Sequence, residues 1–119
     1  MTEQLVLRSQ AAYYVATGVW PILSPRTFQA VTGPKADMWL VKAFGLLVGA
    51  VGLSIGRGTS GGHVSPETRL LASGSALALG GADAWYVARG RIPKTYLLDA
   101  GAQALLLAAL TRAQATNNA

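Results

Sequence analysis

The sequence predicts an all-α protein, an integral membrane four-helix bundle accompanied by one short amphipathic helix. Three observations predict this class. The chain is 51% hydrophobic and only 13% charged, whereas soluble domains carry roughly 25% charged residues. Four apolar segments alternate with short polar connections, and each approaches the ~20 residues that a helix needs to cross a bilayer. The 14 glycines favour helices that pack closely in lipid.

The four apolar segments are bounded by turn residues, which set their expected limits. The first segment ends at a Trp-Pro step. The last segment is short, so it needs the basic side chains at its ends to reach the membrane interfaces. We expect membrane-spanning helices at 5–23, 38–56, 70–88 and 95–110.

The connections between these segments carry their own signals. Residues 25–32 are expected to form the short amphipathic helix, because Ser24 can cap its start and a Gly-Pro step follows its end. Residues 57–66 are rich in Gly, Ser and Thr, which predicts a flexible loop. The polar tail from Arg112 onward is expected to fray.

The whole chain, residues 1–119, is expected to form a single domain, and a weak repeat divides it into two helical hairpins. A Pro-Lys pair at 34–35 precedes one apolar run, and a Pro-Lys pair at 93–94 precedes another. Chance similarity among apolar helices explains this repeat equally well. Two tandem hairpins therefore remain one of two interpretations.

A stripe of glycines runs along the second segment, with one lysine at its start. Lys42, Gly45, Gly49, Gly52 and Gly56 follow one another at spacings of 3, 4, 3 and 4, so they share one helix face. Glycine allows another helix to approach closely, and the lysine predicts a charge inside that contact. We therefore expect the stripe to be a helix-packing face.

Each expected membrane helix carries a polar residue one turn inside an aromatic residue. Because the chain direction reverses from helix to helix, the i, i+3 spacing places these polar residues at one depth, about 5 Å inside an aromatic belt. The polar layer consists of Thr17, Lys42, Asp83 and Asp99, with Gln103 one turn beyond. The belt consists of Trp20, Trp39, Trp85, Tyr86 and Tyr96.

This polar layer has two interpretations. In the functional one, a lysine and two aspartates form a ligand-binding or proton-linked site inside the bundle. In the structural one, Lys42 pairs with one aspartate to fix the helix register, while the other aspartate bonds to a tyrosine or to Gln103. Lys42 can also extend to the interface, because it lies only one turn inside the belt.

Other motifs carry little chemistry. Residues 56–61 match G-x-G-x-x-G, but the dinucleotide motif needs a preceding strand, and an apolar helix is expected here instead. His63 is the single histidine and cysteine is absent, so we expect no metal site and no cofactor. His63 and the two aspartates lie on opposite membrane sides, so we expect no catalytic triad and no enzyme.

The basic residues favour a lipid bilayer as the partner. The net charge of +5 is spread over short connections, without the long basic face typical of nucleic-acid binding. The two membrane sides hold nearly equal numbers of Lys and Arg, so charge does not set the orientation. We expect a multi-pass protein of a cell membrane, the inner membrane of a bacterium.

Parts of the chain resemble a group of small, uncharacterised bacterial four-helix membrane proteins. The resemblance rests on residues 14–21, 26–35 and 96–99, and it implies a bacterial origin and four spans without an activity. Size and topology are also similar to those of the small multidrug-resistance transporters. The first helix lacks the core carboxylate that is essential in that family, which argues against membership.

We expect a non-enzymatic membrane protein from these observations. The extensive Gly and Ala faces favour an accessory or assembly subunit of a larger membrane complex, or a homo-oligomer packed through those faces. The alternative is a small proton-linked transporter or ligand-binding membrane protein that uses Lys42, Asp83 and Asp99.

Overall fold

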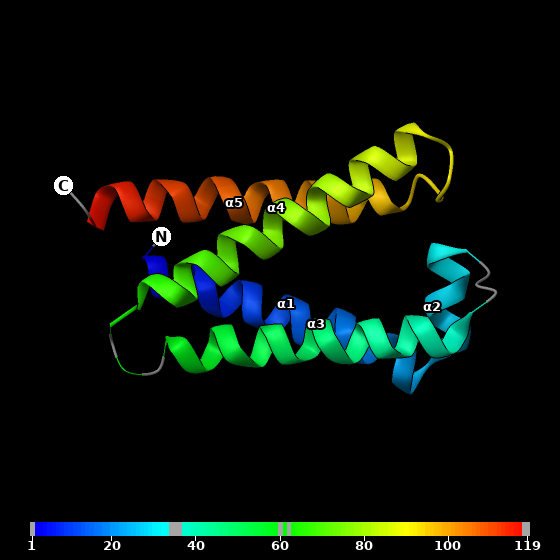
Figure 1. Ribbon diagram of the computed structural model, residues 1–119, viewed down its shortest axis with the longest axis horizontal. Helices are drawn as coiled ribbons and strands as arrows, with labels where there is room; N and C mark the ends of the chain where they lie inside the picture. The colour runs from blue at the N-terminus through cyan, green and yellow to red at the C-terminus, as the bar shows by residue number, and fades with distance from the viewer. Residues whose placement is uncertain (1, 34–36, 60, 62, 118–119) are drawn as a thin grey trace.

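The protein is built from α-helices. The computed structural model describes residues 2–33, 37–59, 61 and 63–117, and within these ranges it contains five helices and no strand. The all-α class predicted from the sequence is confirmed. The helices are α1 (Glu3–Leu23), α2 (Pro25–Thr32), α3 (Met38–Gly58), α4 (Pro66–Ala88) and α5 (Tyr96–Asn117), as Figure 1 shows.

Side-chain caps explain where three of the helices begin. The hydroxyl groups of Thr2, Ser24 and Ser65 each accept a hydrogen bond from the backbone N–H three residues later, at 3.1–3.4 Å. Each cap satisfies a donor that the first helical turn leaves unpaired. The Ser65 cap and the proline that follows it start α4 at Pro66, four residues before the apolar segment expected there, because caps rather than hydropathy set helix ends.

The last helix is longer than the sequence predicts. α5 continues to Asn117, so the expected end at residue 110 and the expected frayed tail from Arg112 are wrong. Leu110 and Ala113 are both buried, and their contacts hold the added turns in place. The short polar residues of this segment gave no sign of that packing.

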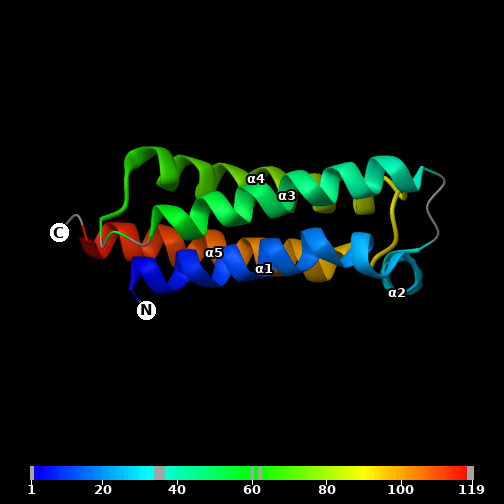
Figure 2. The ribbon, with the colours of Figure 1, turned by 90° about the horizontal axis from the view of Figure 1, so that it is seen from below.

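The four long helices pack as two pairs. α1 lies along α3 and α4 lies along α5, while α1 with α5 and α3 with α4 touch far less. Figures 1 and 2 show α2 and the connection 89–95 at one end, and both chain termini at the other. We call these the α2 end and the terminal end. α3 and α4 diverge toward the α2 end (Figure 1).

Glycine brings α1 and α3 together. A Cβ atom added to Gly18 would overlap the carbonyl oxygen of Gly45 and would lie 2.7 Å from the backbone nitrogen of Gly49. A Cβ atom added to Gly52 would lie 2.9 Å from the carbonyl oxygen of Ala11. Gly45, Gly49 and Gly52 are buried, and Gly56 is half-buried. Backbone therefore meets backbone along this pair, which side chains would prevent.

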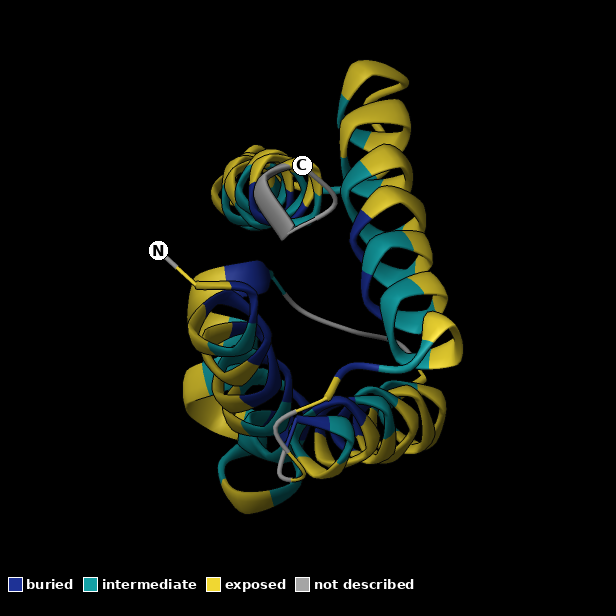
Figure 3. Cartoon of the chain, turned by 90° about the vertical axis from the view of Figure 1, so that its left-hand side faces the viewer, coloured by how far each residue is buried: buried dark blue, intermediate teal, exposed yellow. Residues whose placement is uncertain are grey.

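The hydrophobic core lies toward the terminal end. It joins residues from α1, α3, α4 and α5 with one residue of the 59–65 connection, and Figure 3, viewed from this end, shows the buried residues turned inward. The core residues are Val6, Leu7, Ala11, Tyr14, Ile55, Val64, Ala72 and Leu110. This cluster fills the space between the helix pairs at the terminal end.

The outer surface is rich in large apolar side chains. Trp39 is 71% exposed, Leu70 74% and Leu105 74%, and similar residues lie on the outer faces of all five helices. By length and composition α3 alone among the described helices is apolar enough to cross a membrane, and only 22% of its apolar window is buried. The large side chains of this surface lie outside the core, where soluble proteins rarely gather them in contiguous patches.

Candidate functional site

A cavity of about 370 Å³ lies between the two helix pairs, toward the α2 end. All five helices contribute to its wall. The wall is mostly apolar, with Phe28, Phe44, Val48, Leu79 and Leu98 among its residues. The core at the terminal end closes the far side. The divergence of α3 and α4 therefore leaves a space that ends inside the molecule and does not pass through it.

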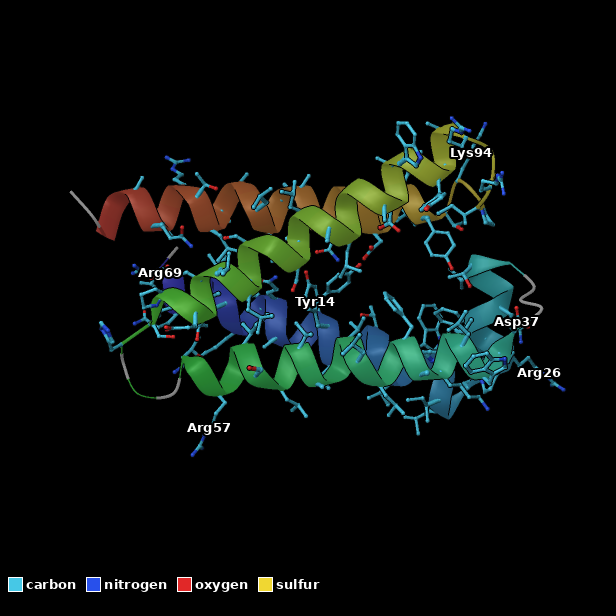
Figure 4. The ribbon with its side chains drawn as sticks, in the orientation of Figure 1. Tyr14, Arg26, Asp37, Arg57, Arg69 and Lys94 are labelled. Atoms are coloured by element: carbon cyan, nitrogen blue, oxygen red, sulfur yellow. The ribbon has the colours of Figure 1, made fainter. Side chains whose placement is uncertain are left out.

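Three buried polar side chains form a chain of hydrogen bonds beside this cavity, which we call the polar relay. The Gln10 amide donates to the carbonyl oxygen of Ala72 at 2.9 Å and to the Tyr14 hydroxyl at 3.1 Å. The Tyr14 hydroxyl donates to Oε1 of Gln103 at 2.6 Å. Tyr14 lies near the centre of the molecule (Figure 4). The relay of Gln10, Tyr14 and Gln103 thus ties α1 to α4 and α5.

The relay ends on two aspartates that line the cavity, Asp83 and Asp99, which we call the acid pair. Nε2 of Gln103 donates to Asp99 at 3.2 Å, and the Tyr13 hydroxyl donates to the same carboxylate oxygen. The carboxyl group of Asp83 interacts with that of Asp99. Oδ2 of Asp83 is buried and has no hydrogen-bond partner among the described residues. Two acidic groups therefore meet at the cavity wall, and one of their oxygens lacks a partner.

The structure divides the polar layer predicted from the sequence. Thr17, Asp83, Asp99 and Gln103 line the cavity together. Lys42 is exposed, lies outside the cavity wall, and forms no ion pair within the described ranges. The prediction that Lys42 belongs to the layer is therefore not met.

The position of Lys42 has a physical cause in the length of α1. Lys42 lies one turn before Gly45 on α3, and at Gly45 the neighbouring atoms of α1 belong to Gly18 and Pro21. Because α1 ends at Leu23, it does not continue along α3 far enough to cover Lys42. The glycine spacing correctly predicts a shared face, but not where the covering helix stops.

The aromatic belt is divided in the same way. Trp20 and Tyr96 line the cavity, and the Trp20 indole N–H donates to the Thr27 hydroxyl at 2.9 Å. Trp39, Trp85 and Tyr86 are exposed on the outside of the helices. Only part of the belt can therefore contact a molecule in the cavity.

The Thr17 hydroxyl is already engaged in a hydrogen bond and adds little to the polar groups of the cavity. It donates to the backbone carbonyl oxygen of Tyr13 at 2.8 Å, within its own helix. The wall also carries the side chains of Thr95 and Tyr96, and its charged groups are those of the acid pair among the described lining residues. Tyr13 and Tyr14 of α1 also line the cavity.

Sequence reasoning missed the role of Gln10. Its side chain is fully buried and bonds two other helices. The spacing of Gln10, Tyr14, Gly18 and Pro21 is 4, 4 and 3, and all four are buried. This one-face pattern on the first segment is the signal that could have revealed the relay.

An ion pair at the terminal end was also missed. Glu3 is 2% exposed, and both of its carboxylate oxygens accept hydrogen bonds from the Arg69 guanidinium at 2.9 Å. The pair joins the start of α1 to the start of α4, where Figure 4 labels Arg69. The two residues are 66 positions apart, so no local spacing indicated their contact.

Comparisons with known proteins add no relative to this description. No family model matches the chain, and neither the curated proteins nor the solved structures contain a significant match. The function is therefore argued from the cavity, the acid pair and the outer surface alone.

Proposed function

We propose that this chain is an integral membrane protein whose four long helices span the bilayer and hold a small, mostly apolar ligand in the cavity. The observation that carries the proposal is the distribution of side chains. Gln10, Tyr14 and Gln103 are buried, with the acid pair beside them, while most of the large leucines and tryptophans are exposed. A soluble protein is expected to show the reverse distribution.

The dimensions of the helices support the membrane part of the proposal. The long helices contain 21, 21, 23 and 22 residues, which correspond to about 31–35 Å at 1.5 Å per residue. The hydrocarbon core of a bilayer is about 30 Å thick. Lys42 lies four residues after the start of α3, near enough to an interface for its ammonium group to reach water.

The average hydropathy of α4 and α5 underestimates how apolar their outer faces are. Their polar residues Asp83, Asp99 and Gln103 lower the average of each helix, yet all three line the cavity rather than the outer surface. The outer residues of the same helices include Leu77 and Leu105, which are 65% and 74% exposed. Length and composition take no account of which side chains face the cavity and which face outward. By these two criteria α3 alone among the described helices could therefore cross a membrane.

The cavity supports the ligand part of the proposal. Small-molecule sites are typically concave and apolar, with a few polar groups that fix orientation, and have volumes of about 300–1,000 Å³. This cavity has a volume of about 370 Å³ with the acid pair on its wall. Its closed far side favours binding over free passage. We propose a non-enzymatic role, because the Thr17 hydroxyl is bonded to its own helix and no Ser, Cys, Lys or His is among the described lining residues.

A second candidate role is assembly with another membrane chain, either a homo-oligomer or an accessory subunit of a larger complex. One observation favours it: small residues lie on the outer faces of α4 and α5, unlike the glycines of α3, which contact α1. Such faces allow close helix contact in lipid. The exposed small residues are Gly74, Ala78 and Gly81 on α4, and Gly101, Ala104 and Ala108 on α5.

A saturable quenching experiment tests the proposed cavity. In detergent, the variant Trp39→Phe/Trp85→Phe keeps Trp20 as its single tryptophan, and Trp20 lines the cavity. We expect bromobenzene to quench Trp20 with a saturable component. The matched variant Trp20→Phe/Trp85→Phe, which reports from the exposed Trp39, is expected to show only the linear quenching of a probe dissolved in the micelle.

Two alanines one turn apart on α4 supply the matched control. Both are exposed, but Ala82 lines the cavity and Ala78 lies outside its wall. Ala82→Phe is expected to remove the saturable component by filling the cavity, and Ala78→Phe is expected to keep it. The proposal fails if Trp20 shows no saturable quenching, or if both phenylalanine variants behave alike.

A further inference from the structure

The charges at the cavity wall are unbalanced. Both members of the acid pair line the cavity, and none of the described lining residues is Lys, Arg or His. The ion pair that the structure gives within its described ranges, Glu3 with Arg69, lies at the terminal end beyond the core. The exposed Lys42 does not reach the pair. A carboxylate in apolar surroundings is strongly unfavourable without a counter-charge or a proton.

The hydrogen bonds around the acid pair leave room for one more donor. Asp99 accepts from Tyr13 and Gln103. Asp83 interacts with the carboxyl group of Asp99, and its buried Oδ2 is without a partner in the described part of the chain. Buried carboxylate oxygens are normally hydrogen-bonded. Asp83 itself lines the cavity, so a rotation of its carboxyl group would bring this oxygen to a bound molecule.

From this geometry we infer that the ligand of the cavity carries an ammonium group on an apolar body. The inference rests on the proposed function and names the ligand's chemical class. The ammonium group donates to Asp83 and balances the acid pair, and the apolar body lies against Phe44, Val48 and Leu98. Trp20, Phe28 and Tyr96 are also at the wall, and aromatic faces attract cations.

Two sources can supply this chemistry, a free lipophilic amine or the ammonium headgroup of a membrane lipid. The shared feature is a positively charged N–H donor in a molecule that also has an apolar part. A proton shared between the two aspartates is the competing way to balance the charge. In that case the cavity has no preference for a cation, and the two cases differ in a binding measurement.

The experiment compares three probes of similar size on the variant that keeps Trp20 alone, in uncharged detergent micelles. The probes are benzylammonium, its neutral carbon isostere ethylbenzene, and the phenylacetate anion. We expect saturable binding with the cation about tenfold tighter than the neutral isostere, and the anion weakest. Equal affinity of cation and neutral isostere, or a preference for the anion, would overturn the inference while leaving the proposed cavity intact. Failure of all three probes to bind would instead count against the proposed function.

Variants of the acid pair add a second readout. Asp83→Asn and Asp99→Asn are expected to lower the affinity for the cation about tenfold and to leave the affinity for ethylbenzene unchanged. Asp37→Asn, at an exposed position before α3, is the control with unchanged affinities. If Asp99→Asn loses its helical circular dichroism, Asp83→Asn and the comparison of probes on the parent variant still decide the question. Unchanged cation affinity in a folded Asp83→Asn would contradict the inference.

Added phosphatidylethanolamine separates the two sources. A lipid ligand is indicated if this lipid displaces benzylammonium while phosphatidylglycerol does not. A free amine is indicated if neither lipid displaces the probe. Both outcomes agree with the ammonium class. Displacement by phosphatidylglycerol alone would point to an anionic headgroup and would overturn it.

Discussion

Individual polar residues link the two helix pairs beside the cavity. Tyr14 of α1 contacts Gln10 on its own helix and Gln103 on α5, and Gln10 continues to the backbone of Ala72 on α4. Every bond of this relay is buried. In such surroundings a lost partner costs more than a bond contributes, because the remaining group stays desolvated. The relay therefore fixes the position of Gln103 and, through it, of Asp99.

The first prediction concerns the centre of the relay. Tyr14→Phe removes the hydroxyl that Gln103 and Gln10 share, which leaves an amide oxygen without its donor. We expect a loss of about 1–3 kcal/mol in the free energy of unfolding, measured by reversible denaturation in detergent. Tyr86→Phe, at an exposed position on α4, is the control with little change. Equal stability of the two variants would show that the relay bonds are not formed.

The second prediction concerns the ion pair at the terminal end. Arg69→Gln leaves the buried Glu3 carboxylate without its two guanidinium bonds, and Glu3→Gln removes the charge that those bonds bind. Each single variant is expected to lower the melting temperature in detergent. The double variant should lower it by less than the sum, because the second change has no pair left to break. Additive effects would mean that the two side chains do not interact.

Among the described helices, α1 and α3 pack most closely, because the glycines between them have no side chains. Gly18 on α1 faces Gly45 and Gly49 on α3, and Gly52 faces Ala11 and Tyr14. This pair also forms one wall of the cavity, since Tyr14, Gly18 and Gly45 line it. A shift of one helix along the other would therefore change both the relay and the cavity.

The third prediction uses alanine to separate contact glycines from open ones. Gly52→Ala places a methyl group 2.9 Å from the carbonyl oxygen of Ala11, and we expect it to cost about 1–3 kcal/mol of stability. Gly81→Ala is the matched change on α4, where an added Cβ has nothing within 4 Å. That variant is expected to gain up to about 1 kcal/mol from helix propensity. The same sign for both variants would contradict the packing of α1 on α3.

The elements differ in how far the sequence could predict them. The 3, 4, 3 spacing of glycines on α3 and the cap at Ser24 are local signals, and local signals predicted the shared glycine face and the start of α2. The end of α5 depends on burial of Leu110 and Ala113 against other helices, and no local pattern encodes that. Lys42 shows the same limit, because its exposure follows from where α1 ends and not from its own neighbours.

In the whole molecule, the two helix pairs touch closely at the terminal end and part toward the α2 end (Figure 1). The sequence indicated that Asp83 and Asp99 share one depth, and the structure brings them together on the cavity wall. The divergence that creates the cavity has no counterpart in the sequence, because it depends on the angle between pairs. Large leucines of α3, α4 and α5 are exposed. The central question for this arrangement is therefore whether lipid or water surrounds the helices.

The absence of cysteine from the chain permits a direct measurement of that solvent. Single cysteines replace Leu46, Leu77 and Leu105, which are 65%, 65% and 74% exposed near the middle of α3, α4 and α5, and a fourth replaces His63 in the connection before α4. Membranes from expressing cells are treated with a membrane-impermeant maleimide, before and after solubilisation in sodium dodecyl sulfate. The account predicts that the three mid-helix cysteines stay unlabelled until the bilayer is dissolved, while His63→Cys is labelled in opened vesicles. Rapid labelling of the mid-helix positions in intact membranes, or recovery of the protein in the soluble fraction, would contradict it.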